Sequence, residues 1–174
     1  MSTDTSIASE GPSWLRTVVI GRYPKRTAIR IVVLVLTSLI VFRFVLLPIR
    51  VDGMSMMPSY KANRVNFVNR LAYVFHSPAR GDVVAVRTSG ISIMYMKRII
   101  GLPGETVRFH RGRAVINGKV LEEPYVRYPC DWEEPPKVLG EDEYYFVGDN
   151  RAMPARDHTK GVAPRSKIVG KVLL

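Results

Sequence analysis

A serine and a lysine are the side chains of this sequence whose surroundings suit covalent chemistry. Ser55 lies in the run VDGMSMMP, residues 51–58, with Gly53 two residues before it and Pro58 three residues after it. Glycine and proline disfavour a helix, so we expect a tight, non-helical segment that presents the hydroxyl. Taken alone, this pattern also describes an ordinary serine in a surface loop.

Lys97 belongs to residues 91–100, a β-branched and aromatic run that predicts a strand. Side chains alternate in a strand, so Lys97 shares a face with Tyr95 and Ile99, whereas Arg98 points the other way. The amine is thus directed into apolar surroundings, where burial lowers its pKa from about 10.4 and allows it to act as a general base. The alternative is an edge-strand lysine whose amine reaches water.

Metal and disulfide chemistry find little support in the sequence. Cys130 is the one cysteine, so no intrachain disulfide can form. His76, His110 and His158 are scattered, and no two have the i, i+4 spacing that lets two imidazoles share a metal on a helix. We therefore expect the histidines to be surface or packing residues, and we expect no metal and no cofactor.

The elements that would position the serine begin with an apolar segment. Residues 31–47, IVVLVLTSLIVFRFVLL, contain three polar residues and with their flanks are long enough to cross a bilayer as a helix. A buried core helix would normally show a polar stripe, and a cleaved signal peptide would have a shorter apolar region followed by a small-x-small site. We expect a tail over residues 1–27, a transmembrane anchor over 28–49 and an exported domain over 50–174.

The charge distribution sets the expected orientation. The chain has 26 Lys+Arg against 15 Asp+Glu, a net charge of +11. Five basic side chains lie between residues 16 and 30, whereas Arg50 and Asp52 cancel just after the anchor, so the positive-inside rule places the N-terminus in the cytoplasm. The other basic residues are dispersed, and nucleic acid is not an expected partner.

The exported part is predicted to be mostly β. Asn117-Gly118 between two apolar pairs predicts a two-residue hairpin turn. Residues 122–143, rich in proline and acidic residues, are expected to form a long irregular loop. The short β-branched and aromatic runs that predict strands are residues 65–68, 82–86, 91–100, 106–109, 114–121, 144–147 and 167–173.

Four segments in order resemble the ordered sequence boxes of the type I signal peptidase (leader peptidase) family. They are VDGMSMMP at 51–58, RGDVV at 80–84, YMKRIIGLPGE at 95–105 and GDNR at 148–151. One box alone is weak, but four in the family's order directly after an apolar segment are highly specific. The resemblance implies one N-terminal transmembrane helix followed by a compact antiparallel β domain of the signal peptidase type.

The resemblance further implies a serine protease with a Ser-Lys dyad. Ser55 would be the nucleophile, Lys97 the general base, and the Ser55 backbone N–H an oxyanion donor. Gly53 places the chain with the members whose serine box has glycine at this position and no hydroxyl. A preprotein signal peptide would lie as an extended chain between residues 49–54 and 94–97, with small side chains at the first and third sites before the cut. The expected substrate-binding residues are Gly53, Met54, Met94, Tyr95 and Met96.

Structural support is expected from the fourth box. We predict that Arg98 pairs with Asp149 and braces the lysine strand against the turn Gly148-Asp149-Asn150. After that turn the family usually has a serine whose hydroxyl orients the lysine, whereas residues 152–161 here are AMPARDHTKG and place a proline or an alanine there. The lysine would then be held by Asn150, by water or by a main-chain carbonyl. Otherwise the proteolytic activity would be weakened or restricted to a special substrate.

The sequence thus predicts a membrane-bound serine endopeptidase that removes N-terminal signal peptides from exported preproteins. Its expected partners are these signal peptides and membrane lipid, and its expected location is a bacterial plasma membrane. The alternative is a catalytically weakened or specialised family member that acts as an extracytoplasmic peptide-binding or secretion-accessory module. Both Ser55 and Lys97 favour the enzyme, because a binding groove needs neither of them.

Overall fold

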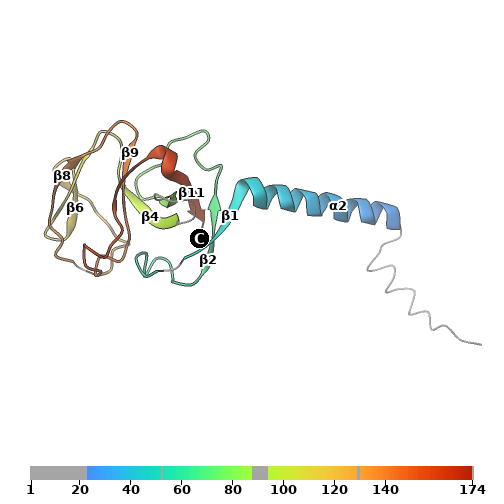
Figure 1. The fold of residues 1–174 in the computed structure, drawn as a ribbon, viewed down its shortest axis with the longest axis horizontal. Coiled ribbons are helices and arrows are strands. Elements are labelled where there is room, and N and C mark those ends of the chain that lie inside the picture. Colours follow the sequence, from blue (N-terminus) through green and yellow to red (C-terminus); the bar gives the residue numbers. More distant parts are fainter. Residues whose placement is uncertain (1–22, 52, 88–93, 129, 174) are drawn as a thin grey trace, which may run out of the picture. The chain divides into compact units, whose positions relative to one another are not determined.

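The computed structural model describes residues 23–51, 53–87, 94–128 and 130–173. The chain divides into two compact units, Met1–Val41 and Phe42–Leu174, and the second is called the β domain below. The first unit contains helix α2 (Pro24–Ile40), which the π-helical turn η1 (Val41–Val45) follows directly. Figure 1 shows the helix and the strands of the β domain.

Helix α2 begins earlier and ends earlier than the segment expected from the sequence. Pro24 is in the first turn, where its fixed φ and missing N–H suit a helix. The segment Pro24–Val45 has 22 residues, none of its most apolar window is buried, and it is long and apolar enough to cross a membrane. Leu46–Arg50 form strand β1 instead of continuing the helix, because Pro48 cannot donate a helical hydrogen bond and fits an edge strand.

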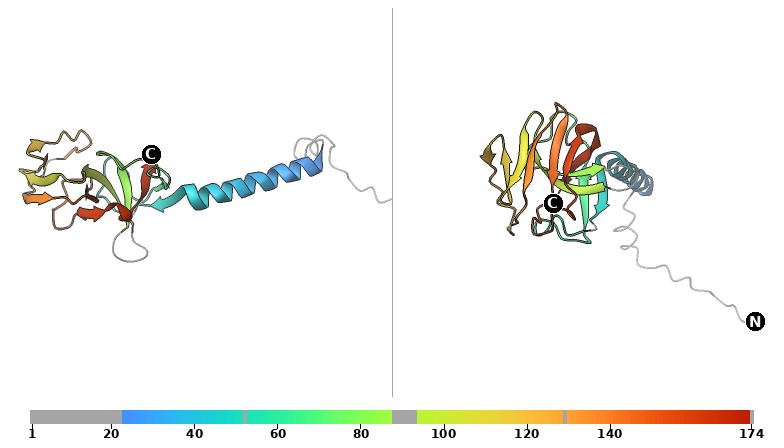
Figure 2. Two further views of the ribbon diagram at one scale, coloured as in Figure 1. Left: turned by 90° about the horizontal axis from the view of Figure 1, so that it is seen from above. Right: turned by 60° about the vertical axis from the view of Figure 1, so that its left-hand side comes forward.

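The β domain contains a large and a small antiparallel sheet, which Figures 1 and 2 show from three directions. The large sheet has the order β1-β2-β11-β3-β4-β9-β10, and the small one has the order β7-β6-β5-β8. The mostly β prediction is therefore confirmed. The strands of the large sheet are β1 (Leu46–Arg50), β2 (Val65–Asn69), β3 (Val83–Arg87), β4 (Met94–Gly101), β9 (Glu143–Val147), β10 (Gly161–Pro164) and β11 (Ile168–Leu173), with the 3-10 turn η2 (Arg165–Lys167) before β11. Those of the small sheet are β5 (Thr106–His110), β6 (Arg113–Ile116), β7 (Lys119–Val120) and β8 (Glu134–Val138).

The large sheet is covered on both faces around strand β3. Val83 and Ala85 belong to an apolar cluster that includes Met56 and Tyr60, whereas Val84 and Val86 belong to another cluster on the opposite face. The segment after β1 therefore packs onto the sheet through Met56, which is 1% exposed. This packing fixes the backbone of the residue just before it, Ser55.

Two predictions about the small sheet have opposite outcomes. The Asn117-Gly118 turn is confirmed, because both residues have positive φ and Ile116 pairs with Lys119 across it. The prediction of an irregular loop over residues 122–143 is wrong for β8, which pairs with β5. Its two prolines are tolerated because β8 is an edge strand, where a missing N–H leaves no partner unsatisfied.

Candidate active site

Ser55 and Lys97 lie in hydrogen-bond contact. Lys97 Nζ donates to Ser55 Oγ at 2.6 Å, although the two residues are 42 positions apart. Lys97 is in the middle of β4, and Ser55 is in the turn that follows β1 and packs on the sheet. The fold thus brings together a hydroxyl and an amine at a distance that permits proton transfer.

The surroundings of Lys97 favour the neutral amine. Its side chain is 3% exposed, and burial lowers the pKa of the amine to about 8, while the Asp149 carboxylate acts weakly in the opposite direction. The alternation predicted from the sequence is confirmed, because Met96 packs with the cluster around Met56 and Ile99 packs on the opposite face. An apolar pocket lined by Tyr95 and Lys97 lies on that second face.

The turn at residues 148–150 holds the backbone of the serine segment. Asn150 N donates to Ser55 O at 2.9 Å, and Asn150 Nδ2 donates to Met54 O at 3.0 Å. A methyl group on Gly148 would lie 2.2 Å from Ser55 O, far inside van der Waals contact. Glycine is therefore required at this position to allow the turn to approach the serine.

The predicted pair of Arg98 and Asp149 is confirmed. Arg98 Nε and Nη2 donate to the two oxygens of Asp149 at 2.8 and 2.6 Å, and Arg98 Nη1 donates to Gly81 O at 2.7 Å. Asp149 is fully buried, and the guanidinium also stacks on the ring of Tyr125 at 3.9 Å. Together with the bond from Asn150 to Ser55, these contacts connect all four sequence segments that carry the family resemblance.

A small pocket beside Ser55 joins the two segments expected to bind substrate. It has a volume of about 40 Å³ and is lined by residues 49–51, Gly53, Ser55 and residues 94–96. Met54 is largely exposed at this point and Met94 is partly exposed, whereas Met96 is nearly buried. Residues 94–97 of β4 pair with β3, and pairing with β9 starts only at Arg98. This half of β4 therefore presents a strand edge next to the serine segment.

Comparison with known proteins identifies the family to which this geometry belongs. The family described as "Signal peptidase, peptidase S26" matches residues 25–174. The chain belongs to this signal peptidase family.

Signal peptidase I of Leptolyngbya laminosa is 34% identical over 128 residues, 69% of this chain and 63% of that protein, so the chain spans less than two thirds of this relative. Signal peptidase I S of Bacillus subtilis (strain 168) is 34% identical over 154 residues, 80% of this chain and 82% of that protein. A crystal structure of a signal peptidase I from Enterococcus faecalis V583 covers 56% of this chain and 97% of its own, with 24% identity and a TM-score of 0.47.

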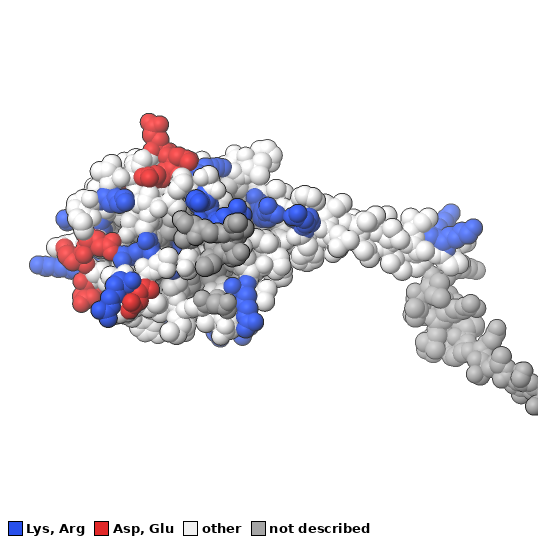
Figure 3. Space-filling view, viewed as in Figure 1, with Lys and Arg blue, Asp and Glu red and all other residues white. Residues whose placement is uncertain are grey.

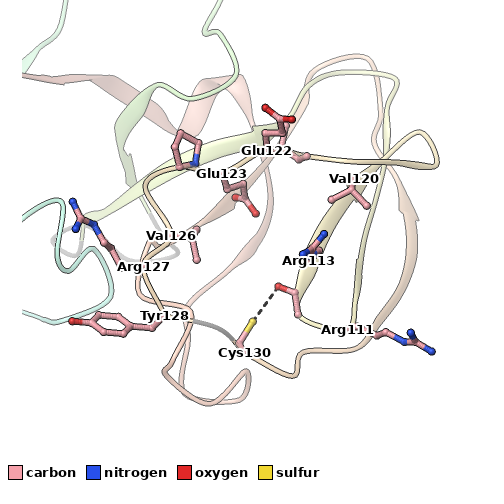
Figure 4. Close-up of a pocket in the computed structure, with 12 residues that line it drawn as sticks. Arg111, Arg113, Val120, Glu122, Glu123, Val126, Arg127, Tyr128 and Cys130 are labelled. Atoms are coloured by element: carbon pink, nitrogen blue, oxygen red, sulfur yellow. Dashed lines mark hydrogen bonds between the residues drawn. The ribbon is translucent and has the colours of Figure 1, made fainter.

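A larger pocket of the β domain lies away from Ser55 and Lys97. Its volume is about 650 Å³, and it is lined by residues 111–113, 120–124, 126–128 and 130, without Ser55 or Lys97 (Figure 4). Cys130 Sγ donates to Gly112 O at 3.2 Å at its edge. Ser55 lines the small pocket described above, and Lys97 lines the pocket of about 360 Å³.

Two buried residues near the dyad were not singled out by the sequence analysis. Arg151 is 1% exposed, donates from Nε to Gly148 O at 2.9 Å and from both terminal nitrogens to Glu123, and faces the Phe109 ring. His158 is 4% exposed. Arg151 is the last residue of the fourth family segment, residues 148–151. Its partner Glu123 lies in residues 122–143, which were expected to form an irregular loop. No signal in the sequence distinguished His158 from the other histidines.

The described residues contain no group of three or more His, Cys, Asp and Glu side chains that could hold a metal ion. Acidic and basic side chains are interspersed on the face of the β domain shown in Figure 3. His110 binds Glu133 at 2.8 Å at the surface, and His76 is exposed.

Proposed function

We propose that this signal peptidase family member is a membrane-bound serine endopeptidase that cleaves N-terminal signal peptides from preproteins. Ser55 is the nucleophile and Lys97 the general base. The observation that carries the proposal is the 2.6 Å contact between Lys97 Nζ and Ser55 Oγ, in a site where burial lowers the pKa of the amine to about 8. The names of the relatives support the same activity.

The reaction follows from the dyad in two steps. Neutral Lys97 takes the proton of Ser55 Oγ as that oxygen attacks the scissile carbonyl, and the resulting ammonium gives the proton to the leaving amine. Lys97 next takes a proton from a water molecule that attacks the acyl-enzyme, and returns it to Ser55 Oγ as the ester bond breaks. One amine thus serves as base and acid in both halves.

The negative charge of the tetrahedral intermediate needs donors near Ser55. The Ser55 backbone N–H is the donor that we assign to this role, because it belongs to the attacking residue and is fixed with it. Gly53 has no side chain to contribute, so the remaining stabilisation comes from main-chain groups or water. This is the glycine variant of the serine box.

The strand edge of β4 and the serine segment suit an extended substrate. A signal peptide lying between residues 49–54 and 94–97 would hydrogen-bond to the backbone as an added strand, and its alternate side chains would face the pocket. The small volume of the pocket beside Ser55, about 40 Å³, suits a small side chain. We assign substrate contact to Gly53, Met54, Met94, Tyr95 and Met96, and cleavage to sites after small-x-small sequences.

The chain presents this site close to the membrane. Ser55 follows the end of the apolar segment, Val45, by ten residues. We place the N-terminal tail in the cytoplasm and the β domain outside a bacterial plasma membrane, because the basic residues gather before the helix. The cleavage site of a membrane-embedded leader emerges at the same surface.

Cleavage of a preprotein in detergent or liposomes tests the proposal. The wild type should cut the leader, whereas Ser55→Ala and Lys97→Ala should leave it intact. Lys97→Arg should also be inactive, because arginine stays charged at any working pH. Ser59→Ala and Lys119→Ala, at exposed positions of the same residue types, are matched controls that should retain full activity. Intact substrate with the wild type, or equal cleavage by all variants, would refute it.

A further inference from the structure

His158 is buried beside the dyad without a hydrogen-bond partner. The residue is 4% exposed, and neither Nδ1 nor Nε2 has a partner among the described residues. Within the part of the chain that the structure describes, these two nitrogens are the buried side-chain polar atoms that lack one. Because an unpaired buried polar group costs free energy, such a group calls for an explanation.

The ring edge of His158 faces the turn that holds Ser55. A methyl group on Gly148 would lie 2.7 Å from His158 Cε1, 2.8 Å from its Nε2 and 2.2 Å from Ser55 O. Gly148 thus has the histidine edge and the serine carbonyl as immediate neighbours. The ring also packs edge-on against Trp132, with centroids 4.9 Å apart.

The charges around the ring keep His158 neutral. Burial and the cations of Lys97, Arg151 and Lys160 together lower its pKa to about 3, and a loose polar contact with the Thr159 backbone, outside hydrogen-bond geometry, acts in the opposite direction. A neutral imidazole has one donor nitrogen and one acceptor nitrogen. An acceptor is therefore available near Lys97 throughout the physiological pH range.

The Lys97 ammonium needs such an acceptor. When Lys97 takes the serine proton it has three N–H donors, and Ser55 Oγ accounts for one of them. In a buried site, ammonium donors without acceptors would raise the barrier to forming the ion.

We propose that His158 is a positioning residue whose acceptor nitrogen binds the Lys97 ammonium formed during proton transfer from Ser55. The inference rests on the proposed function and names the group that orients the base, the third member that activated nucleophiles require. The contact is not made in this structure, and it forms when the amine gains its proton, since hydrogen bonds of this kind tighten in the reacting complex.

Three substitutions separate hydrogen bonding from packing. His158→Phe keeps an aromatic ring against Trp132 but has no acceptor, and His158→Leu is a second acceptor-free variant in case phenylalanine does not fit. His158→Gln restores an acceptor oxygen without a ring. His110→Phe, at an exposed histidine, is the matched control. Thermal unfolding of each full-length variant in detergent shows which of them are folded.

Two measurements on the folded variants decide the inference. For preprotein cleavage, His158→Phe or His158→Leu should lower kcat by about 100-fold with KM unchanged, as expected for a misplaced catalytic group, while His158→Gln should retain most of the wild-type kcat. By NMR of chain labelled with ¹³C at lysine Cε, the Lys97 pKa should fall in the acceptor-free variants and stay near the wild-type value in His158→Gln.

The two measurements also keep this inference apart from the proposed function. Wild-type kcat and an unchanged Lys97 pKa in the acceptor-free variants would overturn the inference and reduce His158 to a packing residue. Equal loss in His158→Gln and His158→Phe would overturn it as well. A Lys97 pKa that responds to His158 as described, in a wild type that cuts no preprotein, would support the contact and refute the proposed function.

Discussion

The Lys97 amine lies 3% exposed beside Ser55, and burial brings its pKa from 10.5 to about 8. The charged form is the one that burial disfavours, so the folded state binds this proton less tightly than the unfolded chain does. Below pH 8 the cost to stability is about 3 kcal/mol, and it disappears as the pH rises towards 10.5. The fold retains this cost at the position where the proposed reaction needs a neutral amine.

The same pKa predicts how activity depends on pH. Because the base must be neutral, kcat/KM for preprotein cleavage should rise with pH along a limb with an apparent pKa near 8 and should fall about tenfold per unit well below it. His158, with a pKa of about 3, should add no limb between pH 5 and 9. The measurement is a series of initial rates in detergent, with circular dichroism at each pH to confirm folding. A flat profile from pH 6 to 9 would contradict the role of Lys97.

At the scale of residues, the sequence predicts the dyad better than its surroundings. Strand alternation already directs Lys97 and Arg98 to opposite faces, and the family segments pair the lysine with Ser55 and Arg98 with Asp149. His158 could not be predicted, since its burial depends on Trp132, a residue 26 positions earlier, and on the absence of a side chain at Gly148. Such neighbours become visible only when the chain is folded.

At the scale of elements, the pair of Arg98 and Asp149 fastens strand β4 to the turn after β9. Asp149 is fully buried and both its oxygens accept from Arg98, so Asp149→Asn leaves a largely buried guanidinium without its counter-ion. We expect this change to lower the free energy of unfolding by about 3–5 kcal/mol. Urea unfolding of the full chain in detergent measures the loss.

A surface pair supplies the control for this experiment. Arg156 and Asp157 are 3.7 Å apart, with side chains 86% and 55% exposed. Asp157→Asn should therefore change the free energy of unfolding by less than about 1 kcal/mol. Equal effects of Asp149→Asn and Asp157→Asn would show that the buried pair does not hold the strand and the turn together.

The strands that the sequence did not predict share one physical feature. β1 contains Pro48, β8 contains Pro135 and Pro136, and β10 ends with Pro164. Proline disfavours a strand assignment because it cannot donate to a ladder, yet each of these strands is at the edge of its sheet. The central strands, which carry Lys97 and its neighbours, were predicted because burial on both faces gives them continuous apolar runs.

At the scale of the whole molecule, the length of chain between helix and serine limits where the reaction takes place. Ten residues separate Val45 from Ser55, and even a fully extended chain of this length spans at most about 35 Å. Strand β1 occupies half of these residues. If the helix anchors the chain as proposed, Ser55 therefore stays close to the lipid surface.

The orientation of the helix decides on which side of the membrane Ser55 lies. Single-cysteine variants can test this orientation. Cys130→Ser supplies the background, because a serine hydroxyl can still donate to Gly112 O. Val138→Cys places a thiol on edge strand β8, where the native side chain is 70% exposed, and Ser6→Cys places one in the N-terminal tail. A membrane-impermeant maleimide should label position 138 in intact bacterial cells or spheroplasts and position 6 only after permeabilisation. The reverse pattern would put Ser55 and Lys97 on the cytoplasmic side, where no translocated preprotein could reach them, and would refute both the orientation and the proposed role in export.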